Sequence, residues 1–227
     1  LNINKLNNII LIKHINIIIS LTTVPRRFNE AINSINYLIK NNCKYKIILN
    51  IPKTYRKWKN FNIPNIKLHN NIIINKCSLD YGPATKLIGT LEYLKINKLF
   101  NIKSVITIDD DQFYNVNYLE KLALMGEKYK NTIITKHGMS LLNYPFKWTN
   151  GISHDKTPLY KSDFPIGVDG VLYPIEKLIN SDIYNLIYKL PNYVFCDDDT
   201  YFGMIAYILN IPIITVSEEI KKISSRI

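Results

Sequence analysis

Three adjacent aspartates follow a short apolar run near the middle of the chain. Residues 104–108 are rich in β-branched side chains, and Asp109, Asp110 and Asp111 come directly after them. An apolar run of this length is typical of a strand buried in a parallel sheet, and the acids would then lie at the carboxyl edge of that sheet, where open α/β folds bind ligands. Adjacent carboxylates repel one another unless a cation lies among them, and an all-oxygen site suits Mg²⁺ or Mn²⁺. The pattern therefore predicts a divalent-cation site.

A second acidic cluster lies near the end of the chain, where Asp197, Asp198 and Asp199 precede an apolar segment with helical periodicity. Carboxylates at the amino terminus of a helix gain from the helix dipole, which keeps them ionised, and an ionised carboxylate can act as a general base. Each cluster also has a simpler interpretation. A single Asp is a common helix cap, and Asn115 with Glu120 can mark a helix start after the first cluster. Two clusters at element boundaries that suit a ligand cleft favour the functional interpretation.

The composition is that of a chain able to build its own core. It has 227 residues, 47% of them hydrophobic, and we expect a single domain over residues 1–227 because no internal repeat or low-complexity linker divides it. Cys43, Cys77 and Cys196 are far apart and show no C-x-x-C spacing. This cysteine usage indicates a reducing compartment or buried thiols, and it argues against a disulfide framework or a zinc site.

The formal net charge of +11 raises the question of a nucleic-acid partner. The basic residues are spread along the chain, however, and no recognition module such as an RRM signature or a zinc finger occurs. Asn, Ile, Lys and Tyr are abundant together, as A/T-rich coding would produce. We therefore expect no nucleic-acid partner and only a secondary attraction for anionic substrates.

The sequence contains no run that approaches the ~18 apolar residues of a membrane span, and it shows no signal-peptide pattern. We expect no membrane span in this chain and a cytoplasmic location, which for a viral protein would be the host cytoplasm. The chain begins with Leu1 and not Met, so an anchor or targeting segment upstream stays open.

Hydrophobic periodicity predicts strands and helices that alternate along the chain. The expected strands are residues 14–21, 45–49, 71–74, 104–108, 132–135, 164–173 and 211–216, and the expected helices are residues 28–40, 84–96, 117–129, 175–188 and 197–209. This alternation predicts a three-layer α/β sandwich with a mostly parallel central sheet. Residues 51–69 are expected to be irregular. Residues 138–163 lack a clear period, and their length favours a functional loop or flap.

The motifs resemble those of glycosyltransferases with the GT-A fold, a Rossmann-like nucleotide-sugar-binding fold. In that family a D-x-D motif after a central strand holds a divalent ion and the sugar nucleotide, and residues 108–112 match it. Residues 198–203 are similar to the acidic motif before a hydrophobic helix in inverting members such as the Fringe-like group. Residues 166–173 resemble the Gly-containing strand that these enzymes place under donor and acceptor.

Two further segments, residues 20–28 and 80–87, resemble a bacterial and viral group of glycosyltransferase-like proteins. The resemblance therefore runs over nearly the whole chain, from about Ile17 to Val216. One departure concerns the metal, because many GT-A enzymes add a His ligand after the acidic helix and no His follows His154 here. Water or another side chain would complete the shell of the ion, as Mg²⁺ and Mn²⁺ tolerate.

The resemblance implies a role for each aspartate that matches the motifs. Asp111 would bind the metal directly. Asp109 would be the second candidate at the metal, facing the ribose or a metal-bound water, and Asp110 would support the pair at the nucleotide. Asp199, or else Asp198, would deprotonate the acceptor hydroxyl.

The resemblance also implies residues that border the donor. Thr22 and Arg27, on the loop after the first strand, would lie beside the nucleotide. Lys86 would meet the diphosphate as a point charge, and the alternative for it is a solvated helix lysine. Gly138, Gly167 and Gly170 would either allow close approach of the backbone to a ligand or serve turns and strand kinks, and for Gly170 the approach to a ligand is favoured.

Four other side chains near the expected cleft have two interpretations each. Trp148 and Tyr144 would stack on a sugar face or anchor the long loop to the core. His137 would follow a strand beside the cleft, in a functional or, more commonly, a structural role. Asp169 is equally undecided.

The implied reaction is a metal-dependent single displacement with inversion. A sugar would pass from a nucleotide-sugar donor, with a UDP-sugar expected, to a hydroxyl of a glycan, protein or lipid acceptor. Mn²⁺ or Mg²⁺ and nearby cations would stabilise the departing diphosphate, while a carboxylate would activate the incoming hydroxyl.

Two other functions are compatible with the motifs. In a phosphohydrolase of the haloacid dehalogenase type, Asp109 would attack phosphorus, Asp111 would act as acid and base, and Asp198 with Asp199 would hold Mg²⁺. Phe113 and the long α/β segment before the motif depart from that family. A non-catalytic binder of anions or nucleic acid would use the basic charge but would leave both acidic clusters unexplained.

Overall fold

The computed structural model describes residues 16–58, 63–64, 68–142, 147–150, 159–181, 183, 186, 194–216 and 224–226. Its strands are β1 (Ile17–Thr22), β2 (Lys46–Pro52), β3 (Ile72–Cys77), β4 (Ser104–Thr107), β5 (Gln112–Tyr114), β6 (Ile133–Leu142), β7 (Lys147–Asn150), β8 (Leu159–Ser162), β9 (Phe164–Pro174), β10 (Ile213–Val216) and β11 (Ser224–Arg226). Its helices are α2 (Phe28–Lys40), α3 (Thr85–Ile96), α4 (Val116–Lys128), α5 (Ile175–Ile179) and α7 (Asp198–Ile208), with 3₁₀ turns η1 (Pro25–Arg27), η2 (Gly82–Ala84) and η3 (Val194–Cys196).

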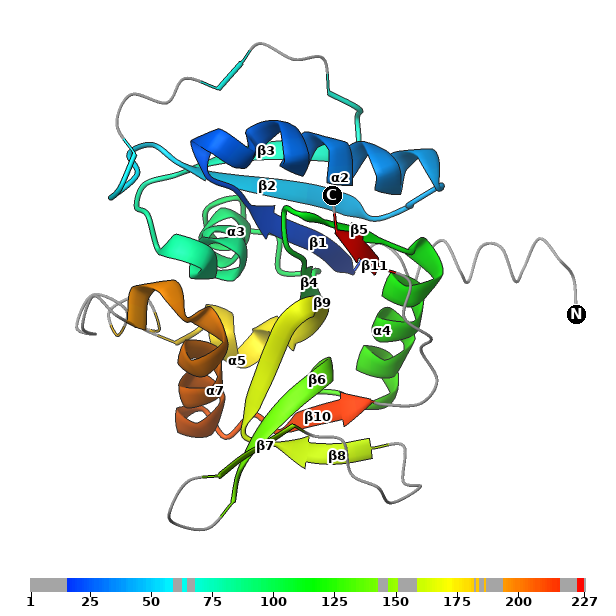
Figure 1. Cartoon of the computed structure of the whole chain (residues 1–227), viewed down its shortest axis with the longest axis vertical. Coiled ribbons are helices and arrows are strands. Elements are labelled where there is room, and N and C mark those ends of the chain that lie inside the picture. The colour runs from blue at the N-terminus through cyan, green and yellow to red at the C-terminus, as the bar shows by residue number, and fades with distance from the viewer. Residues whose placement is uncertain are drawn as a thin grey trace, which may run out of the picture.

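One mixed sheet forms the middle of the molecule, in the order β3-β2-β1-β4-β9-β6-β10-β8, with β7 paired to β6 (Figure 1). Strands β1 to β4 are parallel to one another. Because β9 is antiparallel to both β4 and β6, strands β6 and β10 run in the same direction as β1 to β4. The expected mostly parallel sheet is therefore confirmed, with β9 inserted in the opposite direction.

Helices cover both faces of this sheet. Helices α2 and α4 pack on one face through a cluster that includes Ile35, Leu119 and Ile106, and α3, α5 and α7 pack on the other through a cluster that includes Leu87, Phe202 and Val105. Adjacent residues of β4 thus contribute to different clusters, as strand geometry requires. Burial on both faces explains why the central strands are apolar throughout. The expected three-layer α/β sandwich is confirmed.

The chain order creates a crevice at the carboxyl edge of the sheet between β1 and β4. From β1 the chain proceeds outward to β2 and β3, and it then returns to place β4 on the other side of β1. Ligands of open α/β sheets bind at such a switch point, outside the carboxyl ends of the strands. The loops that leave β1 and β4 carry Thr22 to Arg27 and Asp109 to Asp111, so both lie at this crevice.

Three of the expected elements are wrong in extent. The expected flap at residues 138–163 belongs largely to the sheet in its described part, as the end of β6, all of β7 and all of β8. A register shift in β6 between Thr135 and His137 breaks the alternation that would have revealed the strand. The expected helix 175–188 is interrupted, because α5 has its C-cap at Asn180, while the described residues 183 and 186 are helical again. Residues 51 and 52, expected to be irregular, complete β2.

Two further observations bear on the expectations from composition. No helix among the described residues is both long and apolar enough to cross a membrane. Cys43, Cys77 and Cys196 are free thiols, of which the first two are buried and the third is exposed.

Candidate active site

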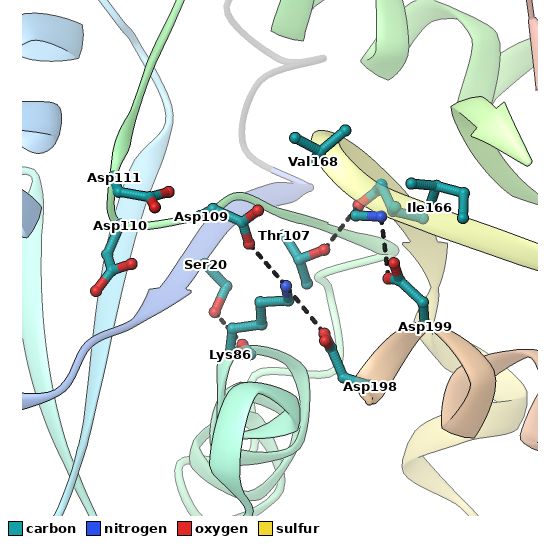
Figure 2. A network of polar contacts seen from close by, with 12 residues as sticks. Ser20, Lys86, Thr107, Asp109, Asp110, Asp111, Ile166, Val168, Asp198 and Asp199 are labelled. Carbon is teal, nitrogen blue, oxygen red and sulfur yellow. Dashed lines mark hydrogen bonds and ion pairs between the residues drawn. The ribbon is translucent and has the colours of Figure 1, made fainter. Parts of the chain in front are cut away.

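A buried lysine joins the two acidic clusters. The Nζ atom of Lys86 lies 2.9 Å from Oδ1 of Asp109 and 2.9 Å from Oδ2 of Asp198. Figure 2 shows Lys86 between these two carboxylates, with Asp199 beside them. The aspartates after β4 and those at the start of α7 therefore meet in space, as the resemblance required.

The ammonium of Lys86 stays charged although only 7% of the side chain is exposed. Burial by itself lowers the pKa of Lys86, but the carboxylates of Asp198 and Asp109 outweigh it and raise this pKa well above its ordinary value. The interpretation of Lys86 as a solvated helix lysine is wrong, because α3 packs against the sheet edge with almost every residue of its first two turns buried.

A buried polar network holds the backbone of Lys86. The hydroxyl of Ser20 donates to the Lys86 carbonyl oxygen. The Nδ2 atom of Asn50 donates to Oγ of Ser20 over 2.9 Å and to Oγ1 of Thr90 over 2.9 Å. Ser20, Asn50 and Thr90 have no exposed surface. Because buried polar groups must be paired, this network fixes the first turns of α3 against β1 and β2.

Asp110 turns into the protein, away from Asp109 (Figure 2). Its Oδ2 accepts a hydrogen bond of 2.6 Å from the hydroxyl of Thr23, and its Oδ1 lies 3.0 Å from Nη2 of Arg27. Burial raises the pKa of Asp110 to about 6, against the opposing effects of Thr23 and Arg27. Asp110 thus anchors the loop after β1 to the loop after β4.

Asp109 and Asp111 are the two carboxylates of the trio that keep access to solvent, with 30% and 40% of their side chains exposed. Asp111 contacts Nη1 of Arg27 at 3.2 Å. Counting Asp198 and Asp199, five carboxylates gather here, whereas the ion pairs of the described residues supply only the two cations Lys86 and Arg27.

These carboxylates fit a divalent cation that is held partly by the protein and partly by a bound diphosphate. The excess of carboxylates over cations favours an added positive charge, and exposed carboxylate oxygens are suitable ligands for Mg²⁺ or Mn²⁺. In the described part of the chain, no three His, Cys, Asp or Glu side chains are arranged to enclose an ion. Asp109 and Asp111 would therefore hold it from one side, with diphosphate oxygens and water on the other.

Tyr114 ties the end of β4 to β9. Its hydroxyl accepts a hydrogen bond of 3.0 Å from the backbone N–H of Asp109 and donates one of 3.0 Å to the carbonyl oxygen of Val168. Only 1% of Tyr114 is exposed. A short strand, β5, places this residue, and the sequence analysis missed both the strand and the role of the tyrosine.

Asp199 lies against the backbone of β9. Its Oδ1 accepts a hydrogen bond of 3.0 Å from the N–H of Gly167. Burial and then the charge of Asp198 raise the pKa of Asp199 to about 7, and Lys86 and Gly167 oppose this shift. A carboxylate with this pKa can both accept and release a proton near neutral pH, which suits a general base. Asp198 is committed to Lys86, so Asp199 is the better candidate of the two.

The two remaining predicted residues, Thr22 and Gly170, lie on strands near the site. Thr22 ends β1, and its hydroxyl donates to the carbonyl oxygen of Asn50 over 2.9 Å. Gly170 has a φ of +86°, and a Cβ there would lie 3.2 Å from the carbonyl oxygen of Thr107. Gly170 therefore lets β9 pass close to the end of β4, which is a role in strand geometry.

A cavity of about 300 Å³ lies beside these residues, and Thr22 is among those that line it. Its charged lining consists of three acids and four basic side chains, and aromatic side chains complete it: Asp80, Asp109, Asp110, Arg26, Arg27, Lys57, Lys86, Tyr55, Trp58 and Phe195. A larger cavity of about 560 Å³ lies at the opposite edge of the sheet and contains none of the candidate residues. The smaller cavity is the one that contains candidate residues, and its basic and aromatic side chains suit an anionic, ring-containing ligand.

Several residues weighed in the sequence do not join this constellation. His137 and Lys136 both contact Oδ2 of Asp169, at 2.7 and 3.2 Å. The hydrogen bond from His137 lowers the pKa of Asp169 well below its ordinary range. Gly138 leaves room for the contact between Ser162 and Thr215. Trp148 belongs to β7, and Tyr144 lies outside the described residues.

Comparison with known proteins adds no family assignment, since neither a protein family model nor a curated protein matches this chain. The site is therefore interpreted from its own chemistry.

Proposed function

We propose that this chain is a metal-dependent glycosyltransferase that moves a sugar from a nucleotide-sugar donor to an acceptor hydroxyl. The observation that carries the proposal is the contact of Lys86 with both Asp109 and Asp198. It brings Asp109, a candidate metal-binding carboxylate, into one site with Asp198, the residue next to the candidate base Asp199. This site lies beside a cavity of about 300 Å³ with charged and aromatic walls.

The residues divide the reaction between two sides. Arg27 and Lys86 face the cavity and would attract the diphosphate of the donor. Asp109 and Asp111 would hold Mn²⁺ or Mg²⁺, which when bound neutralises charge on the departing diphosphate. Asp199 would accept the proton of the acceptor hydroxyl from the side of β9. The proposed base is thus a different group from those that stabilise the leaving diphosphate. This arrangement suits single displacement with inversion.

Lys86 also favours the transferase over a phosphohydrolase of the haloacid dehalogenase type. In the hydrolase, Asp198 and Asp199 would hold Mg²⁺ next to the nucleophile Asp109. The ammonium of Lys86 lies between Asp109 and Asp198, 2.9 Å from each, where that ion would bind. A basic binding protein is less favoured, because it assigns no role to the five carboxylates.

The finer parts of the proposal follow the expectations from the sequence. A UDP-sugar is the donor to test first, and the acceptor is a glycan, protein or lipid hydroxyl. The cytoplasm is the compartment we propose, as expected from the cysteine usage of the sequence.

Thermal unfolding in the presence of nucleotide sugars tests the proposal directly. A ligand that binds only the folded state, at a concentration one hundred times its Kd, raises the free energy of unfolding by about 2.7 kcal/mol. A change of this size is readily measured. UDP-sugars with Mn²⁺ are expected to raise the melting temperature, and sugar transfer to the matching acceptor is expected to be lost in Asp199→Asn. Phosphate release from a generic phosphatase substrate, without stabilisation by any nucleotide sugar, would contradict the transferase.

A further inference from the structure

Arg27 contacts two carboxylates that differ in their access to solvent. Its Nη2 atom lies 3.0 Å from Oδ1 of Asp110, of whose side chain 4% is exposed. Its Nη1 atom lies 3.2 Å from Oδ2 of Asp111, of whose side chain 40% is exposed. The guanidinium therefore bridges the buried Asp110 and the accessible Asp111, which is the first candidate to bind the cation.

The contact with Asp110 is the firmer of the two. Asp110 is held from a second side by the hydroxyl of Thr23 at 2.6 Å. The contact with Asp111 joins two partly exposed side chains, and exposed ion pairs are weak. Nη1 of Arg27 can thus leave Asp111 while Nη2 stays on Asp110.

Arg27 also has donors to spare. Its Nε atom is buried and has no hydrogen-bond partner among the described residues. The side chain lines the cavity that also contains Arg26, Lys57 and Lys86. A guanidinium presents five N–H groups in a fork that matches phosphate oxygens, so a diphosphate in this cavity is a better partner for Arg27 than Asp111 is.

A cation on Asp111 and a guanidinium on the same carboxylate oppose each other. Two positive charges on one carboxylate repel each other, and the repulsion is stronger when one of them is divalent. When no anion is present, Arg27 therefore disfavours a cation at Asp111. When a diphosphate draws Nη1 away, Asp111 is free to bind the cation.

We propose that Arg27 couples the two ligands of this site, so that a divalent cation and a nucleoside diphosphate each bind more tightly in the presence of the other. The inference rests on the proposed function and adds to it a mechanism by which the cation is held only together with the donor. Coupling of this kind is reciprocal and commonly amounts to a five-fold change or more in each affinity.

Binding measurements without turnover test the coupling. Mn²⁺ binding is followed by the electron paramagnetic resonance signal of free Mn²⁺, with protein-free blanks to correct for Mn²⁺ held by UDP. UDP binding is followed by calorimetry, in EDTA and in Mn²⁺. Wild type is expected to bind Mn²⁺ about five-fold or more tightly with UDP than without it. Inorganic pyrophosphate should reproduce this effect, because the contact is to phosphate oxygens.

Arg27→Gln should bind Mn²⁺ alone more tightly than wild type, and the effect of UDP on Mn²⁺ affinity should become smaller, leaving the part that direct coordination by the diphosphate supplies. The matched control is Arg26→Gln, which removes a charge from the same cavity wall at a residue that stacks on Trp58 at 5.3 Å. This control should keep the coupling. If Arg27→Gln binds Mn²⁺ alone no more tightly than wild type does, the inference is wrong.

A second variant tests the coupling through UDP binding, and this test does not require that Arg27→Gln folds. Asp111→Asn removes the competing acid, so it should bind UDP in EDTA more tightly than wild type, while Mn²⁺ improves UDP binding less than it does in wild type. Weaker UDP binding in EDTA would overturn the inference. If wild type binds UDP and Mn²⁺ independently, the coupling fails and the transferase survives. If it binds no nucleotide at all, both proposals fail.

Discussion

The ammonium of Lys86 lies 2.9 Å from a carboxylate oxygen of Asp198, although Lys86 belongs to α3 and Asp198 to α7. The same ammonium reaches Asp109 at the end of β4. One buried cation therefore joins the start of α3, the edge of the sheet and the start of α7 (Figure 2). The geometry of the site depends on this residue more than on any of the aspartates.

Lys86→Met should destabilise the protein. The variant leaves Asp198 and Asp109 without their counter-ion, and breaking a buried ion pair in this way costs about 3–5 kcal/mol. Because 30% of the Asp109 side chain is in contact with solvent, we expect a loss in the free energy of unfolding of about 2–4 kcal/mol, measured by urea titration. The exposed Lys95→Met, on the same helix, should change it by less than about 0.5 kcal/mol.

Stability should fall as the pH rises from about 4 to about 7. Burial raises the pKa of Asp199 to about 7 and that of Asp110 to about 6, so across this range the folded protein binds more protons than the unfolded chain does. Asp199→Asn should reduce this slope, which urea titrations at pH 5 and pH 8 would measure. An equal slope in wild type and variant would contradict the raised pKa of Asp199.

Sugar transfer should have the opposite dependence on pH. Since the base must be ionised, the rate should rise as the pH increases through about 7, where Asp199 loses its proton. Initial rates of the wild-type enzyme between pH 5 and pH 9 would show this rise. A rate that is constant from pH 5 upward would remove Asp199 from the role of base.

Tyr114→Phe should affect both stability and cation binding. Loss of the hydroxyl leaves the N–H of Asp109 and the carbonyl of Val168 without this partner, and an unpaired buried polar group costs about 1–3 kcal/mol. Mn²⁺ affinity should fall with it, because the backbone of Asp109 is no longer tied to β9. Tyr207→Phe is the control, since 85% of Tyr207 is exposed. Unchanged unfolding and Mn²⁺ binding in Tyr114→Phe would show that the hydroxyl does not hold the site.

Two glycines of β9 should respond differently to alanine. A Cβ at Gly167 would lie 3.0 Å from Oδ1 of Asp199, so Gly167→Ala should displace the base and lower the rate of transfer with little change in stability. At Gly170 the positive φ of +86° is strained for any residue with a Cβ, so Gly170→Ala should lower the free energy of unfolding by about 1–2 kcal/mol. Urea titration and initial rates on both variants separate the two roles, and a reversed pattern would contradict this assignment.

The sequence by itself determined the layers and the place of the first acidic cluster. Val105 and Ile106 lie in an apolar β-branched run, and such a run is buried on both faces wherever the strand is placed. Because acids that follow a parallel strand must lie at its carboxyl edge, the position of Asp109, Asp110 and Asp111 followed from local pattern alone. The position of Asp198 and Asp199 at the amino terminus of a helix likewise followed from the local sequence pattern.

Only the tertiary structure decided what each charge contacts. Lys86 is buried because α3 packs on strands β1 to β4, and its two carboxylate partners come from distant parts of the chain. Helical periodicity therefore could not distinguish a solvated lysine from this one. The sequence could not predict which of the adjacent aspartates is buried and which is accessible to solvent. Asp110 is an anchor and Asp111 is accessible because neighbouring residues point in different directions, and the position of Arg27 after β1 brings its guanidinium to both of them. Local pattern determines where a side chain is along its own element, whereas pairing between elements determines its burial, its partners and therefore its chemistry.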